Sequence, residues 1–267
     1  MAVTFAAFFP MRMTFSASPQ ATKPLEFGVV NQQSPIQTAE RWNPILRYLT
    51  EKTGIPLHLK MGATVELTDA MMAREEFDLV YNNHNFQSEY DGQYKVMARW
   101  GGPAIHSAIV VPDESPVRTI EDLRGLAVAF PSRDAFVGYA VPVVALRDHG
   151  VAVREKFAGN QEGALAQLKA RQVDAAAVNS RFLESYARRE RLRTRTVYLS
   201  EPYLELPVLI HPRVPAERAE RLERALLGMR DDPAAAEALR KARCPGFEVA
   251  GERDYDNVRS VYRAIGK

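Results

Sequence analysis

The sequence predicts an α/β fold with mostly parallel sheets, and two observations support this. Short apolar runs typical of buried strands alternate with segments in which apolar residues recur at helical spacing. The chain has 267 residues, of which 46% are hydrophobic and 25% charged. That length and composition suffice for the core of one large or two small globular domains.

The individual elements follow from local patterns. Ser34 and Gln37 stand in capping-box spacing with Pro35 at the first helical position, and Gly54 ends the apolar periodicity of that helix. Pro142 lies inside another helical segment, where its missing N–H should kink or divide the helix. We expect strands at residues 25–31, 55–61, 77–81, 94–99, 106–112, 126–130, 151–158, 173–178, 196–199 and 207–211. We expect helices at residues 34–54, 64–75, 119–123, 136–146, 161–170, 180–190 and 216–229, one restarting at 232–233, and one at 254–265.

The charge balance argues against a nucleic-acid partner. The chain has 35 basic and 33 acidic residues, and its net charge of +2 is spread along its length. One dense basic run, residues 188–195, contains no aromatic residue on which a base could stack. We interpret this run as a solvated helix end.

Metal, cofactor and enzyme chemistry find little support in the sequence. Cys244 is the only cysteine, which excludes an internal disulfide, an iron–sulfur cluster and any multi-cysteine zinc site. His58, His149 and His211 show no metal-binding spacing. No Ser-His-acid signature and no Gly-rich nucleotide-binding motif is present. We therefore expect no metal site, no cofactor and no enzymatic activity.

Residues 1–24 differ in composition from the rest of the chain. Residues 2–11 are apolar and residues 14–22 are small and polar, which is the order found in a secretory signal. The match is imperfect, because no Lys or Arg precedes the apolar run and Pro19 follows the best cleavage site at Ser18. The alternative is a disordered leader, but we expect an exported, periplasmic protein. No later segment approaches the roughly 18 apolar residues of a membrane span.

Polar loops follow five of the predicted strands. Ligands of open α/β sheets bind beyond the carboxyl ends of strands, so these loops are the candidate binding loops. Tyr81 has an alternative role as a core tyrosine, and His84 has one as the start of a helix. The candidates from these loops are Gln33, Ser34, Tyr81, Asn82, Asn83, His84, Ser132, Arg133, Asp134, Asn160, Gln161 and Asn179.

The loop at residues 129–138 is a strand-to-helix turn, which is where anions bind. The free N–H groups of a first helical turn and the helix dipole favour negative charge, and Ser132 and Arg133 add donors beside them. The competing interpretation is that Ser132 or Asp134 only caps the helix and that Arg133 is a solvated surface charge.

The order of several segments resembles the phosphate-, phosphite- and phosphonate-binding proteins of ABC transporters. The resemblance covers residues 25–211, and each segment is a weak signal alone, although their order and spacing together are specific. The segments are residues 25–30, 42–46, 77–81, 115–125, the turn at Ser132, 158–165 and 173–175.

This resemblance implies a two-lobed type 2 periplasmic-binding fold with a ligand cleft between the lobes. One lobe would comprise residues 25–107 and 206–267, and the other residues 108–205. A protein of this kind binds a small anionic ligand as a monomer and presents it to a membrane permease. The alternatives are a ligand-sensing module of the same fold and, less favoured, an enzyme built on it.

The resemblance also assigns roles at the cleft. Ser132 would bind an oxyanion, whereas Arg133, Asp134, Ala135 and Phe136 replace the Ser, Thr and Gly residues expected after it. A guanidinium suits a phosphonate, sulfonate or carboxylate, and Phe136 could flank an organic group, which disfavours plain phosphate.

Four further positions correspond to ligand-binding positions in the family. Asn160 and Gln161 replace a His-Glu pair that occurs in phosphonate binders, and His106 corresponds to a ligand-contacting aromatic residue. Glu205 loosely matches the acid that receives the ammonium group in aminophosphonate binders.

Overall fold

The computed structural model describes residues 1, 23–31, 33–83 and 86–267. The expected signal segment falls mainly on residues 2–22, and the candidate ligand residue His84 falls on a short gap, so both predictions lie outside the described residues.

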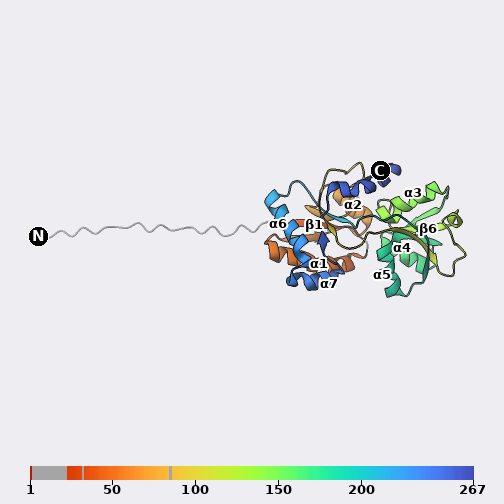
Figure 1. The fold of residues 1–267 in the computed structure, drawn as a ribbon, viewed down its shortest axis with the longest axis horizontal. Helices are drawn as coiled ribbons and strands as arrows, with labels where there is room; N and C mark the ends of the chain where they lie inside the picture. Colours follow the sequence, from red (N-terminus) through yellow and green to blue (C-terminus); the bar gives the residue numbers. More distant parts are fainter. Residues whose placement is uncertain (2–22, 32, 84–85) are drawn as a thin grey trace.

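The chain forms two lobes, one around β1 and one around β6 (Figure 1). The first lobe is built on a six-stranded sheet in the order β11-β4-β10-β3-β1-β2. Its strands are β1 (Leu25–Val29), β2 (Leu57–Lys60), β3 (Leu79–Tyr81), β4 (Lys95–Trp100), β10 (Pro207–Ile210) and β11 (Phe247–Glu248). Its helices are α1 (Pro35–Thr53), α2 (Val65–Ala73), α6 (Ala216–Leu227), α7 (Ala236–Ala242) and α8 (Asp256–Ala264), with short 3-10 turns η4 (Gly228–Arg230), η5 (Pro233–Ala235) and η6 (Glu252–Tyr255). We call this part lobe 1.

The second lobe, lobe 2, is built on a five-stranded sheet in the order β7-β6-β8-β5-β9. Its strands are β5 (Ser107–Pro112), β6 (Ala127–Phe130), β7 (Arg154–Phe157), β8 (Ala175–Asn179) and β9 (Thr194–Leu199). Its helical segments are η2 (Glu121–Leu123), η3 (Phe136–Ala140), α3 (Val141–Asp148), α4 (Gln161–Lys169) and α5 (Ser180–Glu190).

The predicted α/β class is confirmed, and the sheets are mixed. Strand β1 pairs in parallel with β2 and β3, and β6 pairs in parallel with β7 and β8. Strands β5 and β10 are antiparallel to both of their neighbours. The chain enters each of these two strands directly after it crosses between the lobes. No helix lies between the strand it leaves and the strand it enters, so these are not the crossover connections that give parallel pairing.

The two crossing segments are joined to each other. An antiparallel bridge links Ile105, before β5, to Tyr203, before β10. The Ile105 N–H donates to the Tyr203 carbonyl at 2.7 Å, and the Tyr203 N–H donates to the Ile105 carbonyl at 2.8 Å. This bridge fixes the distance between the lobes at one point.

Helix α1 begins and ends where the sequence predicts. The Ser34 hydroxyl accepts the Gln37 N–H at 3.4 Å, and Gly54 ends the helix in the left-handed conformation with φ of 66°. The capping box is one-sided, since the Gln37 side-chain oxygen has no hydrogen-bond partner among the described residues. The Ser34 hydroxyl alone therefore caps this helix.

Pro142 divides its helix, as expected. Residues Phe136–Ala140 form a π-helical turn, in which the Ala140 N–H reaches the Ala135 carbonyl at 3.0 Å. The α-helix α3 then begins at Val141 with Pro142 in its first turn, where a missing N–H costs no helical hydrogen bond. The first turn of this helical segment of lobe 2, next to the cleft, is therefore wider than an α-helical turn.

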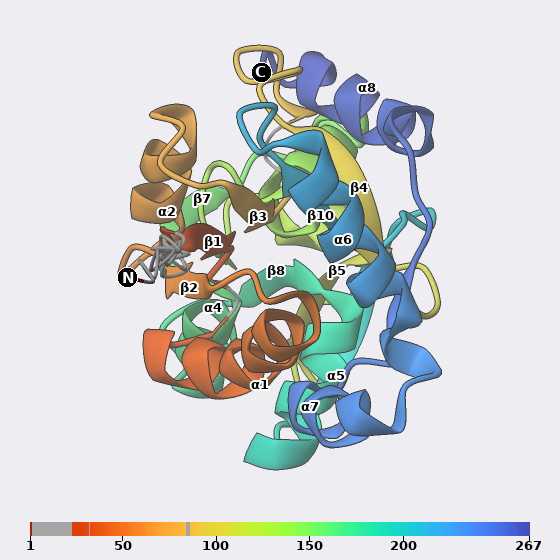
Figure 2. The ribbon, with the colours of Figure 1, turned by 90° about the vertical axis from the view of Figure 1, so that its left-hand side faces the viewer.

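The lobes touch at the end of the molecule that carries α8 (Figure 2). The Tyr262 hydroxyl of α8 donates to the Asp134 carbonyl at 3.0 Å, and Arg147 of α3 donates to the Ala264 carbonyl at 2.8 Å. The Phe136 ring packs edge-on against Tyr203, with 4.8 Å between ring centres. Helices α1, α5 and α7 lie at the opposite end in the same view (Figure 2).

Among the helices of the described residues, none combines the length and the apolar character that crossing a bilayer requires.

We expect Asp232 to stabilise the packing of α7 against α1 in a pH-dependent manner. Its carboxylate accepts hydrogen bonds from Lys52 at 2.7 Å and Tyr48 at 2.9 Å, and it caps η5 through the Ala234 N–H at 3.0 Å. The Lys52 ammonium, with these two other donors, lowers the pKa of Asp232 from its usual 3.8 to about 2. Because this pKa is depressed, the stabilisation is present above pH 3.8 and is lost as the pH falls through about 2.

The variant Asp232→Asn should therefore unfold at lower urea concentration than the unmodified protein at pH 7, and the difference should shrink below pH 4. The neighbouring Asp231→Asn is the matched control, since Asp231 is exposed and has no ion pair among the described residues. An equal loss at pH 7 and pH 3 would contradict the proposed ionic contribution.

Candidate functional site

A small cavity lies where the strand ends of the two lobes meet. Its volume is about 30 Å³, room for about two water molecules. Both lobes contribute to its wall, through the loops after β1, β3, β6 and β8 and the starts of α2 and α4. The lining residues are Val30, Asn31, Val65, Asn83, Pro131, Ala135, Phe136, Val137, Gly138, Gln161, Asn179 and Leu206.

The turn after β6 presents a helix opening to this cavity. The Ser132 hydroxyl accepts the N–H groups of Asp134 and Ala135, at 3.2 and 3.1 Å, so Ser132 caps the turn from a fully buried position. No acceptor is recorded, within the part of the chain that the structure describes, for the next N–H groups, those of residues 136–138. These three residues line the cavity, and their N–H groups are the free donors of the helix opening.

Three side-chain amides complete the donor set. The Gln161 oxygen accepts the Asn179 N–H at 2.7 Å, and the Asn179 oxygen accepts the Arg181 N–H at 2.9 Å. Since both oxygens are occupied, the NH₂ end of each amide is left as a donor. The Asn83 side chain has no recorded partner among the described residues and is 5% exposed. The cavity is therefore lined by neutral N–H donors from both lobes.

Arg133 and Asp134 line neither this small cavity nor the second, larger cavity of the cleft that is described below. The Arg133 side chain is 63% exposed, forms an ion pair with Glu155 at 3.3 Å and stacks over Phe157 at 4.6 Å from the ring centre. Asp134 forms an ion pair with Lys267. The side chains of both residues serve the surface packing of lobe 2 and its contact with the chain end, while Ala135 and Phe136 line the small cavity.

Three other predicted residues have local structural roles. Asn160 caps α4 by accepting the Gly163 N–H at 2.8 Å, and Ser34 caps α1 as described. Asn82 is fully buried and donates to Asp69 at 3.1 Å. None of the three lines either cavity.

Tyr81 and His106 also lie beside the cavities rather than in their walls. Tyr81 packs in an aromatic cluster, with its ring centre 4.8 Å from that of Trp42 and 5.5 Å from that of Trp100. This agrees with the alternative interpretation of Tyr81 as a core residue. The His106 ring donates to the Ser200 carbonyl at 2.7 Å, which joins the two crossing segments.

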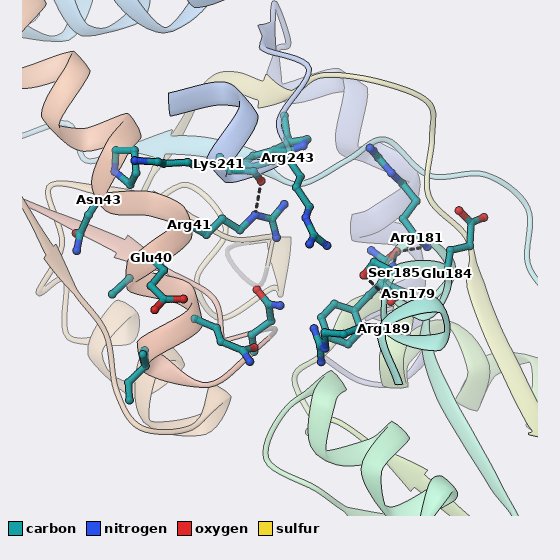
Figure 3. A pocket seen from close by; sticks show the side chains of 18 of the residues that line it. Glu40, Arg41, Asn43, Asn179, Arg181, Glu184, Ser185, Arg189, Lys241 and Arg243 are labelled. Atoms are coloured by element: carbon teal, nitrogen blue, oxygen red, sulfur yellow. Dashed lines mark hydrogen bonds between the residues drawn. The ribbon is translucent and has the colours of Figure 1, made fainter. Parts of the chain in front are cut away.

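A second, much larger cavity opens between α1 and α7 of lobe 1 and α5 of lobe 2, with a volume of about 1080 Å³ (Figure 3). This is near the upper end of ordinary small-molecule sites, which span roughly 300 to 1,000 Å³. Gln33 and Asn179, both predicted site residues, are in its wall. Asn179 lines both cavities, so the small cavity lies beside the large one.

Glu205 lies in the wall of the large cavity as a buried charge. Its side chain is 7% exposed, forms an ion pair with Arg181 at 2.9 Å and accepts the Tyr81 hydroxyl at 3.4 Å. Burial raises the pKa of Glu205, and the guanidinium groups of Arg181 and Arg41 oppose that rise. The next residue along the chain, Leu206, lines the small cavity.

Sequence reasoning missed the cationic residues of the large cavity. Arg41, Arg181 and Arg243 come from α1, α5 and the residue after α7, which are far apart in the chain. Only Arg181 carried a signal, since it follows the predicted strand-end residue Asn179 by two positions.

The described residues show no group of three or more His, Cys, Asp or Glu side chains arranged to hold a metal ion. Ala242 and Arg243 line the large cavity, so Cys244, the next residue, lies close to it. From the sequence, Cys244 was expected to lie far from the cleft. Burial raises the pKa of the Cys244 thiol to about 12, so it is protonated at neutral pH and is no nucleophile.

Comparison with protein families gives one match that spans most of the chain. The family described as ABC transporter, phosphonate, periplasmic substrate-binding protein matches residues 27–255. Comparison with curated proteins gives no significant match.

Solved structures share the fold at low sequence identity. PhnD1 from Prochlorococcus marinus (MIT 9301), solved in complex with methylphosphonate, is 16% identical with a TM-score of 0.81 over 92% of this chain and 99% of that one. A binding protein component of an ABC phosphonate transporter from Pseudomonas aeruginosa is 15% identical, with a TM-score of 0.78 over 89% and 85%. XAC2383 from Xanthomonas citri, solved with chloride, is 18% identical, with a TM-score of 0.74 over 91% and 97%. These likenesses confirm the predicted two-lobed fold.

We expect Arg181→Gln to destabilise the protein by about 2 kcal/mol at pH 8, because it leaves the buried Glu205 carboxylate without its ionic partner. Without Arg181, burial raises the Glu205 pKa further. A raised pKa makes the loss largest at high pH, where Glu205 must ionise, and smaller in acid, where it is protonated. Urea unfolding at pH 8 and pH 5 measures both effects.

The double variant Arg181→Gln/Glu205→Gln should recover most of the lost stability. Arg188→Gln, an exposed position on the same helix with no ion pair among the described residues, is the matched control and should change little. Equal losses in the single and double variants would rule out the buried charge as the cause.

Proposed function

The chain belongs to the family of periplasmic substrate-binding proteins of phosphonate ABC transporters, and from this we propose that its ligand is an alkylphosphonate bound in the small cavity between the lobes. The observation that carries the proposal is the set of free N–H donors that line this cavity from both lobes. A phosphonate group would accept from the helix opening at residues 136–138 and from the amides of Asn83, Gln161 and Asn179.

The donor set favours a phosphonate over inorganic phosphate. The phosphate dianion retains a P–OH proton that needs an acceptor, whereas the phosphonate dianion has none. The lining of the small cavity contains no Asp or Glu among the described residues to accept such a proton. The cavity does contain the apolar side chains of Val30, Val65 and Phe136. These suit the carbon that a phosphonate bears in place of the fourth oxygen.

The small cavity has to widen for binding, since about 30 Å³ is less than a tetrahedral oxyanion occupies. The bridge between Ile105 and Tyr203 would serve as the hinge, because both crossing segments pass through it. Closure would then bring the donors of both lobes onto the ligand and exclude water, which strengthens each hydrogen bond.

We further propose that the protein acts as an exported monomer that presents its ligand to a membrane permease. One chain supplies both walls of the small cavity, so ligand binding requires no second copy. The basic run expected to be a solvated helix end is partly neutralised, since Arg189 pairs with Glu162 at 2.6 Å and Arg193 with Asp113 at 3.2 Å. This supports the expectation of no nucleic-acid partner.

We expect Gln161→Glu to weaken methylphosphonate binding by about 100-fold, measured by isothermal titration calorimetry. The substitution keeps the shape and the oxygen that accepts the Asn179 N–H. It replaces the free NH₂ donor with a carboxylate oxygen, which repels the oxyanion.

Two controls accompany this variant. Gln172→Glu makes the same charge change at an exposed turn outside both cavities, and Arg133→Ala removes a cation that lines neither. Both should keep the affinity of the unmodified protein within about twofold. Strong binding by Gln161→Glu, or weak binding by Arg133→Ala, would place the ligand elsewhere and count against the proposed site.

A further inference from the structure

The large cavity has a strong excess of positive charge. Seven Lys and Arg side chains line it against three Glu side chains. The cations come from both lobes: Arg41, Arg47, Lys241 and Arg243 from lobe 1, and Arg181, Arg188 and Arg189 from lobe 2. Figure 3 shows Arg243 projecting between the two walls.

The cations differ in how far the protein itself neutralises them. Arg189 and Lys241 form ion pairs with glutamates, and Arg181 pairs with Glu205. For Arg41, the recorded contacts are a hydrogen bond to the Ala242 carbonyl and stacking over an indole, neither of which cancels its charge. For Arg243, no acceptor is recorded among the described residues.

The cationic cavity adjoins the proposed phosphonate site. Asn179 lines both cavities, and Glu205 and Leu206 face one each. Arg181 stands in the first turn of α5, where the helix dipole adds to its positive potential. A substituent that leaves the small cavity past Asn179 therefore enters a region of positive potential.

The ammonium-receiving role that the family resemblance implied for Glu205 fits this arrangement poorly. Glu205 is already paired with Arg181 at 2.9 Å, and Arg41 adds a second positive charge near it. An ammonium group would have to displace a guanidinium. A carboxylate or a second phosphoryl group would instead meet guanidinium donors, which bind such groups in bidentate fashion.

We propose that the ligand of this protein is a phosphonate whose carbon skeleton carries a second anionic group, and that Arg181 and Arg243 hold that group from opposite walls of the large cavity. The proposal rests on the proposed function, because it takes the small cavity as the phosphonate site. The second anion also has a role in closure. Cations on both walls repel one another, and an anion between them turns that repulsion into attraction.

Calorimetric titration with four probes tests the proposal. They are propylphosphonate, 2-aminoethylphosphonate, 3-phosphonopropionate and propane-1,3-bisphosphonate, whose substituents are neutral, cationic, carboxylate and phosphoryl. We expect 3-phosphonopropionate, propane-1,3-bisphosphonate or both to bind about 10-fold or more tightly than propylphosphonate. We expect 2-aminoethylphosphonate to bind most weakly. Comparison of the carboxylate and phosphoryl probes identifies the second group.

Arg243→Gln is the decisive variant. It should remove most of the advantage that the preferred doubly anionic probe has over propylphosphonate. Because Arg243 is exposed, a melting curve suffices as the folding control. Arg253→Gln makes the same charge change at an exposed position outside the cavity and should leave the affinity of every probe unchanged.

Four results would overturn the inference. Equal affinity for propylphosphonate and both doubly anionic probes, or an equal drop for all probes in Arg243→Gln, would show that no second anion site exists while leaving the proposed function intact. Tightest binding of 2-aminoethylphosphonate would return Glu205 to the ammonium role. Failure of every probe to bind would overturn the proposed function together with this inference.

Discussion

The antiparallel bridge between Ile105 and Tyr203 joins the two segments by which the chain passes between lobes, and the arrangement of the cleft depends on it. Its two hydrogen bonds, at 2.7 and 2.8 Å, keep the start of β5 beside the approach to β10. Glu205 and Leu206 come two and three residues after Tyr203, so the same bridge helps to set where the partition between the two cavities lies. A change of angle at this point would move whole lobes, whereas the side chains at each strand end would stay fixed to their own sheet.

The proposed ligand would meet two kinds of hydrogen-bond donor in the cleft. In the small cavity, the donors are backbone and amide N–H groups, whose positions are set because Ser132 caps the turn and the Gln161 and Asn179 oxygens are already bonded. Neutral dipoles held in this way stabilise an oxyanion without the desolvation that a buried cation would require. In the large cavity, the proposed second anionic group would meet guanidinium groups that remain partly in water, and such contacts favour selectivity by charge over close fit.

Local sequence patterns were sufficient to predict much of the fold and some of the residues that line the two cavities. The alternation of strand and helix patterns, the Ser34 cap, the Gly54 end and the break at Pro142 all depend on neighbours in the chain. The strand-end rule found Asn83, Gln161 and Asn179 because the carboxyl ends of parallel strands meet at one edge. Arg133 was placed at the ligand because the rule gives a loop but not the direction of each side chain. Its guanidinium turns to Glu155 and Phe157. Arg243 had no local signal, since only the packing of α7 on α1 brings it to the cleft.

The cations at the α5 end of the cleft give a physical reason for closure there to depend on the ligand. At the α8 end, Tyr262 and Arg147 donate hydrogen bonds between the lobes, so contact there needs no ligand. At the α5 end, cations from both lobes face a cavity of about 1080 Å³, and approach of the walls raises their repulsion steeply as the intervening water leaves. The Arg181–Glu205 pair removes part of this cost within the chain. On the proposed mode of binding, a ligand would offset the remainder with its own negative charge, and the number of charges that it brings would then be a criterion of recognition.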